Sequence, residues 1–152
     1  MMEISRLQND AEAQICAKMM AKSEPWVTLQ RDEQASSNMI TDPLREVYLA
    51  KQGEEIQGFV VIVMQGAFVG YIQSICVAPD VRGQGIGKKL MTFAEERIFR
   101  DAPNVFICVS SFNPRVQSLY LKLGYQLIGE IKDYIVKGHS EMLLRKTVGP
   151  IT

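Results

Sequence analysis

The order of the hydrophobic patterns constrains the fold of this chain more than any other feature of its sequence. Three stretches with the composition of strands follow one another with only turns between them, at 45–51, 56–64 and 68–77. A doubly wound nucleotide-binding fold would place a helix between most of its strands, so this run argues against that class. The patterns predict an α+β fold with a mixed sheet. Its central strand should be 68–77, which is apolar on much of both faces.

The remaining patterns complete one fold over residues 1–152. The chain has no repeat, low-complexity tract or Pro/Ser-rich linker, and 152 residues with 47% apolar composition suit one core. We therefore expect a single domain of about seven strands flanked by four helices. The further strands are expected at 2–7, 105–109, 125–136 and 141–145, and the helices at 10–22, 26–40, 84–100 and 113–123.

The composition excludes several classes of partner. Lys and Arg number 17 and so do Asp and Glu, so no excess charge draws the protein to nucleic acid or to an anionic membrane. No apolar stretch reaches the ~18 residues of a membrane span, and the acidic start does not resemble a signal peptide. We expect a cytoplasmic protein. Three well-separated cysteines (Cys16, Cys76 and Cys108) suit reduced thiols better than a disulfide framework or a metal site.

The segment Arg82-Gly83-Gln84-Gly85-Ile86-Gly87-Lys88 combines alternate glycines with the start of a helix. Glycines remove the Cβ atoms that would keep an anion away from the backbone N–H groups. The helix has no Ser, Thr or Asp cap, and it places Lys88 and Lys89 at its positive end. That placement is unfavourable by a few tenths to ~1 kcal/mol per charge unless an anion binds there. The segment therefore predicts a phosphate site, the alternative being a simple turn with solvated lysines.

Two familiar phosphate loops do not fit this spacing. A Walker loop would require glycine at 82 and Ser or Thr at 89, where Arg82 and Lys89 stand. A dinucleotide fingerprint beginning at Gly83 would require glycine at 88, where the chain has Lys88. The site should therefore belong to another class of phosphate-binding protein.

Two segments together resemble the GNAT superfamily of N-acetyltransferases. Arg82-x-x-Gly85-x-Gly87, between a strand ending at 75–79 and an amphipathic helix, is similar to the acetyl-CoA motif of that family. Asn113-Pro114-Arg115 followed by 118–125 resembles its Asn…Tyr…Leu-Gly-Phe/Tyr segment. The resemblance implies a GNAT-like mixed sheet and an enzyme that uses acetyl-CoA and no metal.

The resemblance also implies a role for each matching position. Backbone N–H groups of the glycine turn would hold the pyrophosphate, and the strand end at 75–77 would bond the pantetheine arm as an added strand does. The Val77 N–H would face the thioester oxygen. Asn113 would bond the arm, and Tyr120 would protonate the leaving thiolate. The implied cofactor-binding residues are Ile75, Cys76, Val77, Arg82, Gly83, Gln84, Gly85, Ile86, Gly87, Lys88, Asn113 and Tyr120.

Two of these residues also have purely structural explanations. Asn113 precedes Pro114 at the start of the helix at 113–123, so it is equally suited to cap that helix. Tyr120 lies on the apolar stripe of the same helix, which is typical of a half-buried core tyrosine. The sequence leaves both alternatives open.

The proton acceptor and the acceptor amine are less determined. Many members of the family place a glutamate on one of the two strands beside the glycine turn, but 71–76 and 106–110 contain no carboxylate. A water chain held by Gln73 and Ser74 is the default expectation. Glu141 and Asp133 are the acidic candidates, although an ordinary surface carboxylate is the simpler interpretation of Glu141. By resemblance, the amine would bind between the Trp26 region and the hairpin at 134–141, near Trp26, Gln73 and Tyr134.

The function implied is direct transfer of an acetyl group from acetyl-CoA to a primary amine of a small molecule or peptide. The alternative is a non-catalytic acyl-CoA-binding regulatory module, because the family's usual glutamates are missing. Pairing of two copies through the late strands is compatible with the sequence.

Overall fold

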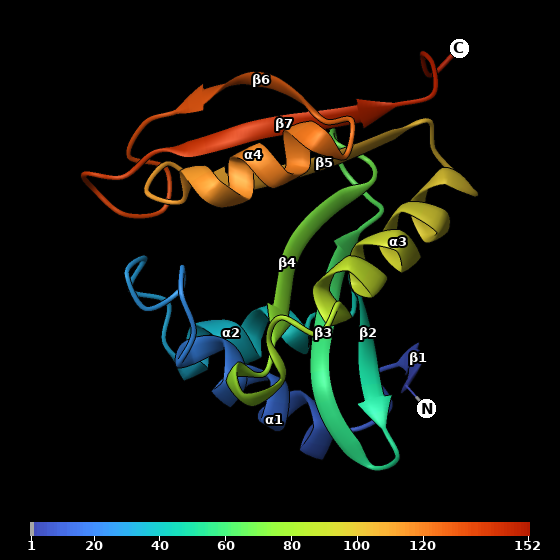
Figure 1. Cartoon of the computed structure of the whole chain (residues 1–152), viewed down its shortest axis with the longest axis vertical. Coiled ribbons are helices and arrows are strands. Elements are labelled where there is room, and N and C mark those ends of the chain that lie inside the picture. The colour runs from blue at the N-terminus through green and yellow to red at the C-terminus, as the bar shows by residue number, and fades with distance from the viewer. Residues whose placement is uncertain (1) are drawn as a thin grey trace.

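The computed structural model describes residues 2–152 and is organised around a seven-stranded mixed sheet, shown in Figure 1. The strand order is β1-β2-β3-β4-β5-β7-β6. Every neighbouring pair is antiparallel except β4 and β5, which are parallel. The strands are β1 (Met2–Arg6), β2 (Arg45–Gln52), β3 (Glu55–Val63), β4 (Tyr71–Val77), β5 (Asn104–Ser110), β6 (Gln126–Ile131) and β7 (Glu141–Thr147).

Four α-helices cover the two faces of this sheet. One buried cluster joins the sheet to α3 and α4, through residues such as Leu90 and Tyr120. A second cluster joins the opposite face to α1 and α2, through residues such as Cys16 and Ile40. These findings confirm the predicted α+β fold with seven strands and four helices. The helices are α1 (Asp10–Ala21), α2 (Glu33–Ile40), α3 (Ile86–Phe99) and α4 (Pro114–Lys122).

The structure differs from the sequence-based prediction in the extent of three elements. The helix expected at 26–40 begins at Glu33, because the Asp32 carboxylate accepts the Ala35 N–H at 2.9 Å and caps the helix there. The strand expected at 68–77 begins at Tyr71. The strand expected at 125–136 ends at Ile131, since a turn with positive φ at Asp133 follows it.

The parallel pair β4 and β5 is in register at two positions, Tyr71 with Phe106 and Ile72 with Ile107. The register of β3 with β4 shifts just beyond this point and leaves Gln73 as an extra residue on β4. Such a bulge bends a strand and increases its twist. The two central strands therefore diverge after Ile72 and leave an opening within the sheet.

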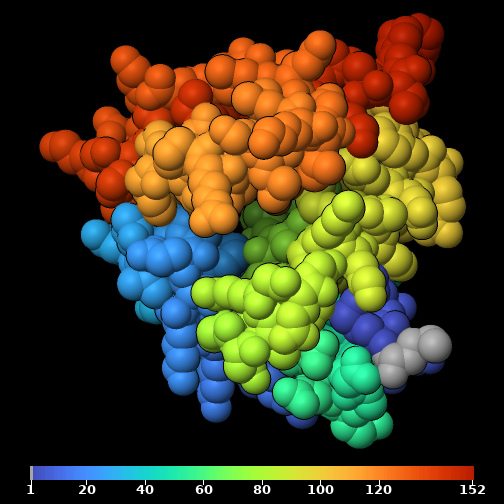
Figure 2. All heavy atoms as spheres, viewed as in Figure 1, coloured from blue at the N-terminus to red at the C-terminus, as the bar shows by residue number. Residues whose placement is uncertain are grey.

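The opening is visible on the molecular surface. Figure 2 shows a hollow bordered by the segments near residues 20–30, 80–90 and 113–120, with green atoms of the sheet recessed between them. In Figure 1, β5, β6, β7 and α4 lie on one side of the opening, and β1 to β3 with α1 and α2 lie on the other. Within residues 2–152, no helix is both long and apolar enough to cross a membrane.

Gly70, just before the point where β4 and β5 pair, tests how tightly this part of the sheet is packed. Its φ is +93°, and an added Cβ would lie 2.3 Å from the Asn104 carbonyl oxygen and 2.7 Å from the Ile98 side chain. We expect Gly70→Ala to lower the free energy of unfolding by about 3 kcal/mol, because backbone strain and overpacking add. Urea unfolding measures this change.

Gly66→Ala is the matched control. Gly66 has nearly the same φ, +94°, but a Cβ there meets no atom within 4 Å. The free energy of unfolding of Gly66→Ala should therefore fall by only about 1 kcal/mol, the contribution of backbone strain. Equal losses in the two variants would show that the contact between Gly70 and Asn104 is not tight.

Candidate functional site

The glycine turn before α3 presents a row of backbone donors. Gly83 and Gly85 are in the left-handed region, with φ of +80° and +82°, and Gly85 is the N-cap residue without a side-chain cap. The first amide bonded into the helix is that of Lys89, which donates to Gly85 O at 3.1 Å. Among residues 2–152, the N–H groups of 83–88 have no acceptor. They are therefore available to an anion.

The space in front of this turn is open. A Cβ at Gly83 or Gly85 would meet no protein atom within 4 Å, and one at Gly87 would meet Val77 at an ordinary 3.7 Å. The first turn of α3 has no acidic residue, while Lys88 and Lys89 are exposed beside it. The glycines are therefore not required for packing within the chain. Their missing side chains leave room for a ligand.

The end of β4 offers further donors. Ala78 N donates to Gln57 O at 2.8 Å, which makes Gly58 and Val77 a non-hydrogen-bonded pair of the antiparallel ladder. The N–H of Val77 therefore faces away from β3, toward the opening. By the same alternation, the N–H of Ile75 also faces the opening.

Cys76, between these two residues, faces the other way. Its side chain is 3% exposed in the cluster with α1 and α2, and burial raises the pKa of its thiol to about 11. The Cys76 thiol is therefore a core group. Of the three strand residues implied by the resemblance, Ile75 and Val77 are the ones with backbone donors toward the opening.

Arg82 is exposed, but its guanidinium is hydrogen-bonded to two neighbouring segments. Its Nε donates to Val77 O at 3.2 Å and its Nη2 donates to Ser23 Oγ at 3.1 Å. Ser23 follows α1 and is buried. Arg82 thus joins the glycine turn to the end of β4 and to the segment after α1.

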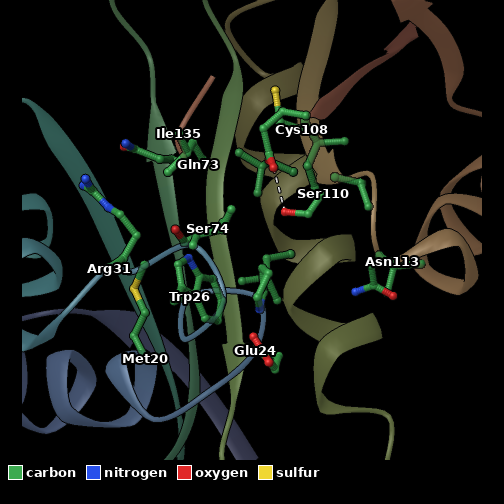
Figure 3. Close-up of a pocket in the computed structure, with 18 of the residues that line it drawn as sticks. Met20, Glu24, Trp26, Arg31, Gln73, Ser74, Cys108, Ser110, Asn113 and Ile135 are labelled. Atoms are coloured by element: carbon green, nitrogen blue, oxygen red, sulfur yellow. Dashed lines mark hydrogen bonds between the residues drawn. The ribbon is translucent and has the colours of Figure 1, made fainter. Parts of the chain in front are cut away.

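A cavity of about 570 Å³ occupies the opening between β4 and β5, as the close-up in Figure 3 shows. Its walls come from segments that are far apart in the sequence. The structure brings together eight residues that the sequence analysis selected separately: Trp26, Gln73, Ser74, Ile75, Asn113, Tyr120, Tyr134 and Glu141.

Glu141, the first residue of β7, is the carboxylate buried deepest in this cavity wall. It is 4% exposed, and Ser110 Oγ donates to its Oε2 at 2.7 Å, the bond drawn in Figure 3. Burial raises the pKa of the Glu141 carboxyl, while the Ser110 hydrogen bond and the nearby His139 oppose the rise. The interpretation of Glu141 as an ordinary surface carboxylate is therefore wrong.

Tyr120 on α4 has a buried ring and also lines the cavity. The residue is 8% exposed and stacks edge-on against Tyr125, with ring centroids 5.7 Å apart. Its hydroxyl makes no hydrogen bond to any residue in 2–152, and burial raises its pKa to about 12. The phenol therefore stays protonated at neutral pH and can donate a hydrogen bond or a proton.

Asn113 does not cap α4 with its side chain, which corrects that alternative. It stands at the N-cap position, but its φ of −125° and ψ of 64° bring no side-chain bond to the helix. Figure 3 shows its amide at the cavity. The amide is therefore available to a ligand.

The two side chains proposed to hold a water chain already have protein hydrogen-bond partners. Gln73 Oε1 accepts a hydrogen bond from Arg45 Nε at 2.6 Å, and Ser74 Oγ lies 3.8 Å from the sulfur of Met39. Asp133, the other acidic candidate, is exposed in a turn where it accepts the Gly138 N–H at 2.7 Å. Glu141 is thus the acidic candidate that lies in the cavity.

Several lining residues could not be found by inspection of motifs. Tyr71 and Cys108 lie side by side on the diverging strands, and burial raises the pKa of both side chains. Met20, Arg31, Ser36 and Met39 come from α1, α2 and the segment between them. No sequence pattern marks these residues, since the cavity exists only once the two strands have diverged. Within residues 2–152, no group of three or more His, Cys, Asp or Glu side chains could hold a metal ion.

A comparison with family models matches residues 10–125 to the model described as the Acetyltransferase (GNAT) family. No curated protein matches the chain significantly. Many solved structures share its fold.

Three of these structures show which kinds of protein share the fold. One is a putative GNAT acetyltransferase from Desulfovibrio desulfuricans, at 14% identity, coverage of 98% of this chain and 100% of that one, and TM-score 0.79. Another is the ribosomal-protein-S18-alanine N-acetyltransferase from Escherichia coli, at 18% identity, 100% and 97% coverage, and TM-score 0.75. The third is an aminoglycoside 6'-N-acetyltransferase complexed with coenzyme A, at 16% identity, 97% and 98% coverage, and TM-score 0.75.

The burial of Glu141 leads to a prediction about stability and pH. A carboxyl whose pKa is raised on folding stabilises the fold most below its unfolded pKa, near 4.5, and loses that contribution as pH rises through the folded pKa. Glu141→Gln removes the cost of burying a charge and keeps a group that can bond Ser110. We expect the variant to have a higher Tm than the wild type at pH 7 and no such advantage at pH 4.

Glu130→Gln is the control for this measurement. Glu130 is also bonded to a serine hydroxyl, that of Ser140, but it is exposed. Its replacement should change the Tm little at either pH, because an exposed carboxylate keeps its hydration. Glu141→Gln melting below the wild type at pH 7 would contradict the predicted cost of the buried charge.

Proposed function

The chain belongs to the acetyltransferase (GNAT) family, and from that premise we propose that it transfers an acetyl group from acetyl-CoA directly to a primary amine of a small molecule or peptide. One observation carries the proposal. The glycine turn presents unpaired backbone donors on one side of the end of β4. On the other side lies the cavity, which holds the buried carboxylate of Glu141 and the protonated phenol of Tyr120.

The glycine turn fits the pyrophosphate of acetyl-CoA. The N–H groups of 83–88 have no other acceptor among the described residues, and the positive end of α3 favours negative charge. The open space at Gly83 and Gly85 lets phosphate oxygens approach the backbone. Lys88 and Lys89 add positive charge at the same helix start.

The strand end and Asn113 fit the pantetheine arm. The N–H groups of Ile75 and Val77 face the opening, so an extended amide-bearing arm can bond to β4 in place of β5. The free Asn113 amide can bond the arm from α4. When bound, acetyl-CoA supplies the activated acetyl thioester. The Val77 N–H then serves as a donor to the thioester oxygen.

Glu141 is the proposed proton acceptor. An aliphatic ammonium has a pKa near ~10.4, so it must lose a proton before it can attack. A base is more effective when its pKa approaches the working pH, and burial raises the pKa of Glu141 in that direction. Ser110 and β7 hold the carboxylate in the cavity, where an amine would enter.

Tyr120 is the proposed proton donor to the departing sulfur. Its hydroxyl has no partner among the described residues, and its raised pKa keeps the proton in place until a stronger base is present. Its ring is held by α4 and Tyr125, so the hydroxyl is positioned by packing.

The alternative of a non-catalytic acyl-CoA-binding module depended on the missing glutamates of β4 and β5. Glu141 places a carboxylate in the same cavity from β7, so the chain does not lack an acidic group at the site. This observation favours the enzyme over the regulatory module.

Gly87 gives a test of cofactor binding that is separate from folding. It lies in the first turn of α3 and lacks a positive φ, and a Cβ there meets Val77 at 3.7 Å. Gly87→Ala should therefore keep or raise the Tm, since alanine favours a helix. It should weaken acetyl-CoA binding by about 10-fold or more in calorimetry, because the methyl group takes the space of a phosphate oxygen.

Gly129→Ala is the control, since Gly129 lies on β6 and a Cβ there meets nothing within 4 Å. It should bind acetyl-CoA as the wild type does. Unchanged affinity in Gly87→Ala would remove the argument that the glycine turn holds the pyrophosphate.

Turnover tests the two proton-transfer roles. With acetyl-CoA and an amine substrate, Glu141→Gln should lower kcat/KM by about 100-fold or more, the loss expected for a general base. Tyr120→Phe should lower kcat by about 10- to 1,000-fold and change the dissociation constant of acetyl-CoA little. Release of the CoA thiol measures both.

Tyr125→Phe is the control for Tyr120. Tyr125 is also buried, but its hydroxyl donates to Glu95 at 2.7 Å and it does not line the cavity. This variant should turn over as the wild type does below its own Tm. Full activity in Tyr120→Phe would make Tyr120 a core tyrosine with no catalytic role.

A further inference from the structure

The cavity wall contains few charged side chains. Of its lining residues only Glu24, Arg31 and Glu141 carry a charge, and the rest are apolar or neutral. The state of these three groups determines which acceptor the cavity suits, because charge left unpaired in a wall must be matched by the ligand.

Both carboxylates are already engaged. Glu24 accepts the Thr28 N–H at 3.0 Å through Oε1 and the Thr28 hydroxyl at 2.8 Å through Oε2. Glu141 accepts from Ser110. Neither carboxylate forms an ion pair within residues 2–152, and Glu24 is exposed, so among the lining residues Glu141 is the one buried carboxylate that the wall offers to an amine.

Arg31 is the one positively charged side chain among the lining residues, and it is exposed. Within residues 2–152 its guanidinium makes no hydrogen bond or ion pair, and its acidic neighbour Asp32 is used to cap α2. Its backbone is fixed, since Arg31 N donates to Trp26 O at 2.9 Å after a positive φ at Gln30. Figure 3 shows Arg31 beside Trp26 and across the cavity from Ser110.

The cavity wall between Arg31 and Glu141 is largely apolar. Met20 and Leu29 are buried, and Trp26 and Met39 pack against the same core cluster. Methionine and tryptophan side chains suit an apolar or aromatic ligand body. Ser36 on α2 adds a hydroxyl that has no partner among the described residues.

We propose that the acceptor is an amine with a carboxylate at its other end and an apolar body between them, the chemistry of a short hydrophobic peptide. The amine lies at Glu141, the apolar body along Trp26 and Met39, and the carboxylate at Arg31. The inference rests on the proposed function. It separates this protein from aminoglycoside acetyltransferases of the same fold, whose name states a different acceptor.

The test compares two acceptors that differ only at the far end, leucyl-phenylalanine and its C-terminal amide. Release of the CoA thiol should give a kcat/KM about 2- to 5-fold higher for the free acid, because a bond between a carboxylate and an exposed arginine is charge-assisted but screened by solvent. An aminoglycoside, added as a polycationic acceptor, should be the poorest substrate of the three.

Arg31→Met should lower the acid-to-amide ratio to about 1, since methionine keeps the apolar stem and removes the charge. Arg100→Met is the matched control, because Arg100 is an exposed arginine that does not line the cavity. This control should keep the ratio of the wild type.

The outcomes distinguish failure of the inference from failure of the proposed function. Three results would overturn the inference and leave the proposed function in place. They are an acid-to-amide ratio near 1 in an active wild type, a ratio that Arg31→Met does not change, and a preference for the aminoglycoside. No thiol release with these three acceptors would overturn the inference, and no thiol release with a wider panel of primary amines and peptides, in protein that binds acetyl-CoA, would overturn the proposed function as well.

Discussion

The divergence of β4 and β5 is the constraint on which the rest of the site depends. The two strands pair at Tyr71 and Ile72 and then separate next to the bulge at Gln73. A separation within a sheet leaves backbone donors and acceptors without partners, each at a cost of about 1–3 kcal/mol if it is also cut off from water. The opening avoids this cost because the cavity is open to solvent, so water or an extended ligand can bond these groups. The same divergence creates the space in which Glu141, Tyr120 and Trp26 meet.

The electrostatics of the glycine turn follow from the same geometry. Because β4 ends beside the start of α3, the uncapped helix terminus and the free N–H of Val77 lie at one end of the opening. A ligand with negative charge at one end and amide groups along its length therefore finds both features in the right order. The sequence alone predicted the anion site here, since missing caps, alternate glycines and two lysines can all be read without a structure.

What the sequence predicted well was local, and what it missed depends on tertiary structure. The order of strands and helices along the chain and the presence of the glycine turn follow from periodicity and from backbone chemistry. Asn113 was equally suited to capping, and only its backbone angles show that the amide does not reach the helix. Glu141 follows a polar turn and reads as a surface residue. It is buried because β7 places it opposite Ser110 at the end of β5. The unpaired charge of Arg31 could be recognised only with Asp32 and Glu24 assigned to their own hydrogen bonds.

Arg82 has a consequence for how the two proposed substrates would influence each other. Its guanidinium bonds the carbonyl of Val77 and the hydroxyl of Ser23, which itself donates to the Met19 carbonyl at 2.7 Å. Ser23 lies near the start of the segment between α1 and α2 that contains Trp26 and Arg31. A phosphate that draws Arg82 away from Ser23 changes the restraint on that segment, and hence its affinity for the acceptor. Since such coupling is reciprocal, an acceptor that tightens the segment must alter the affinity for the cofactor by the same factor. Under the proposed function, the cofactor and the acceptor would thus be thermodynamically linked through a single side chain.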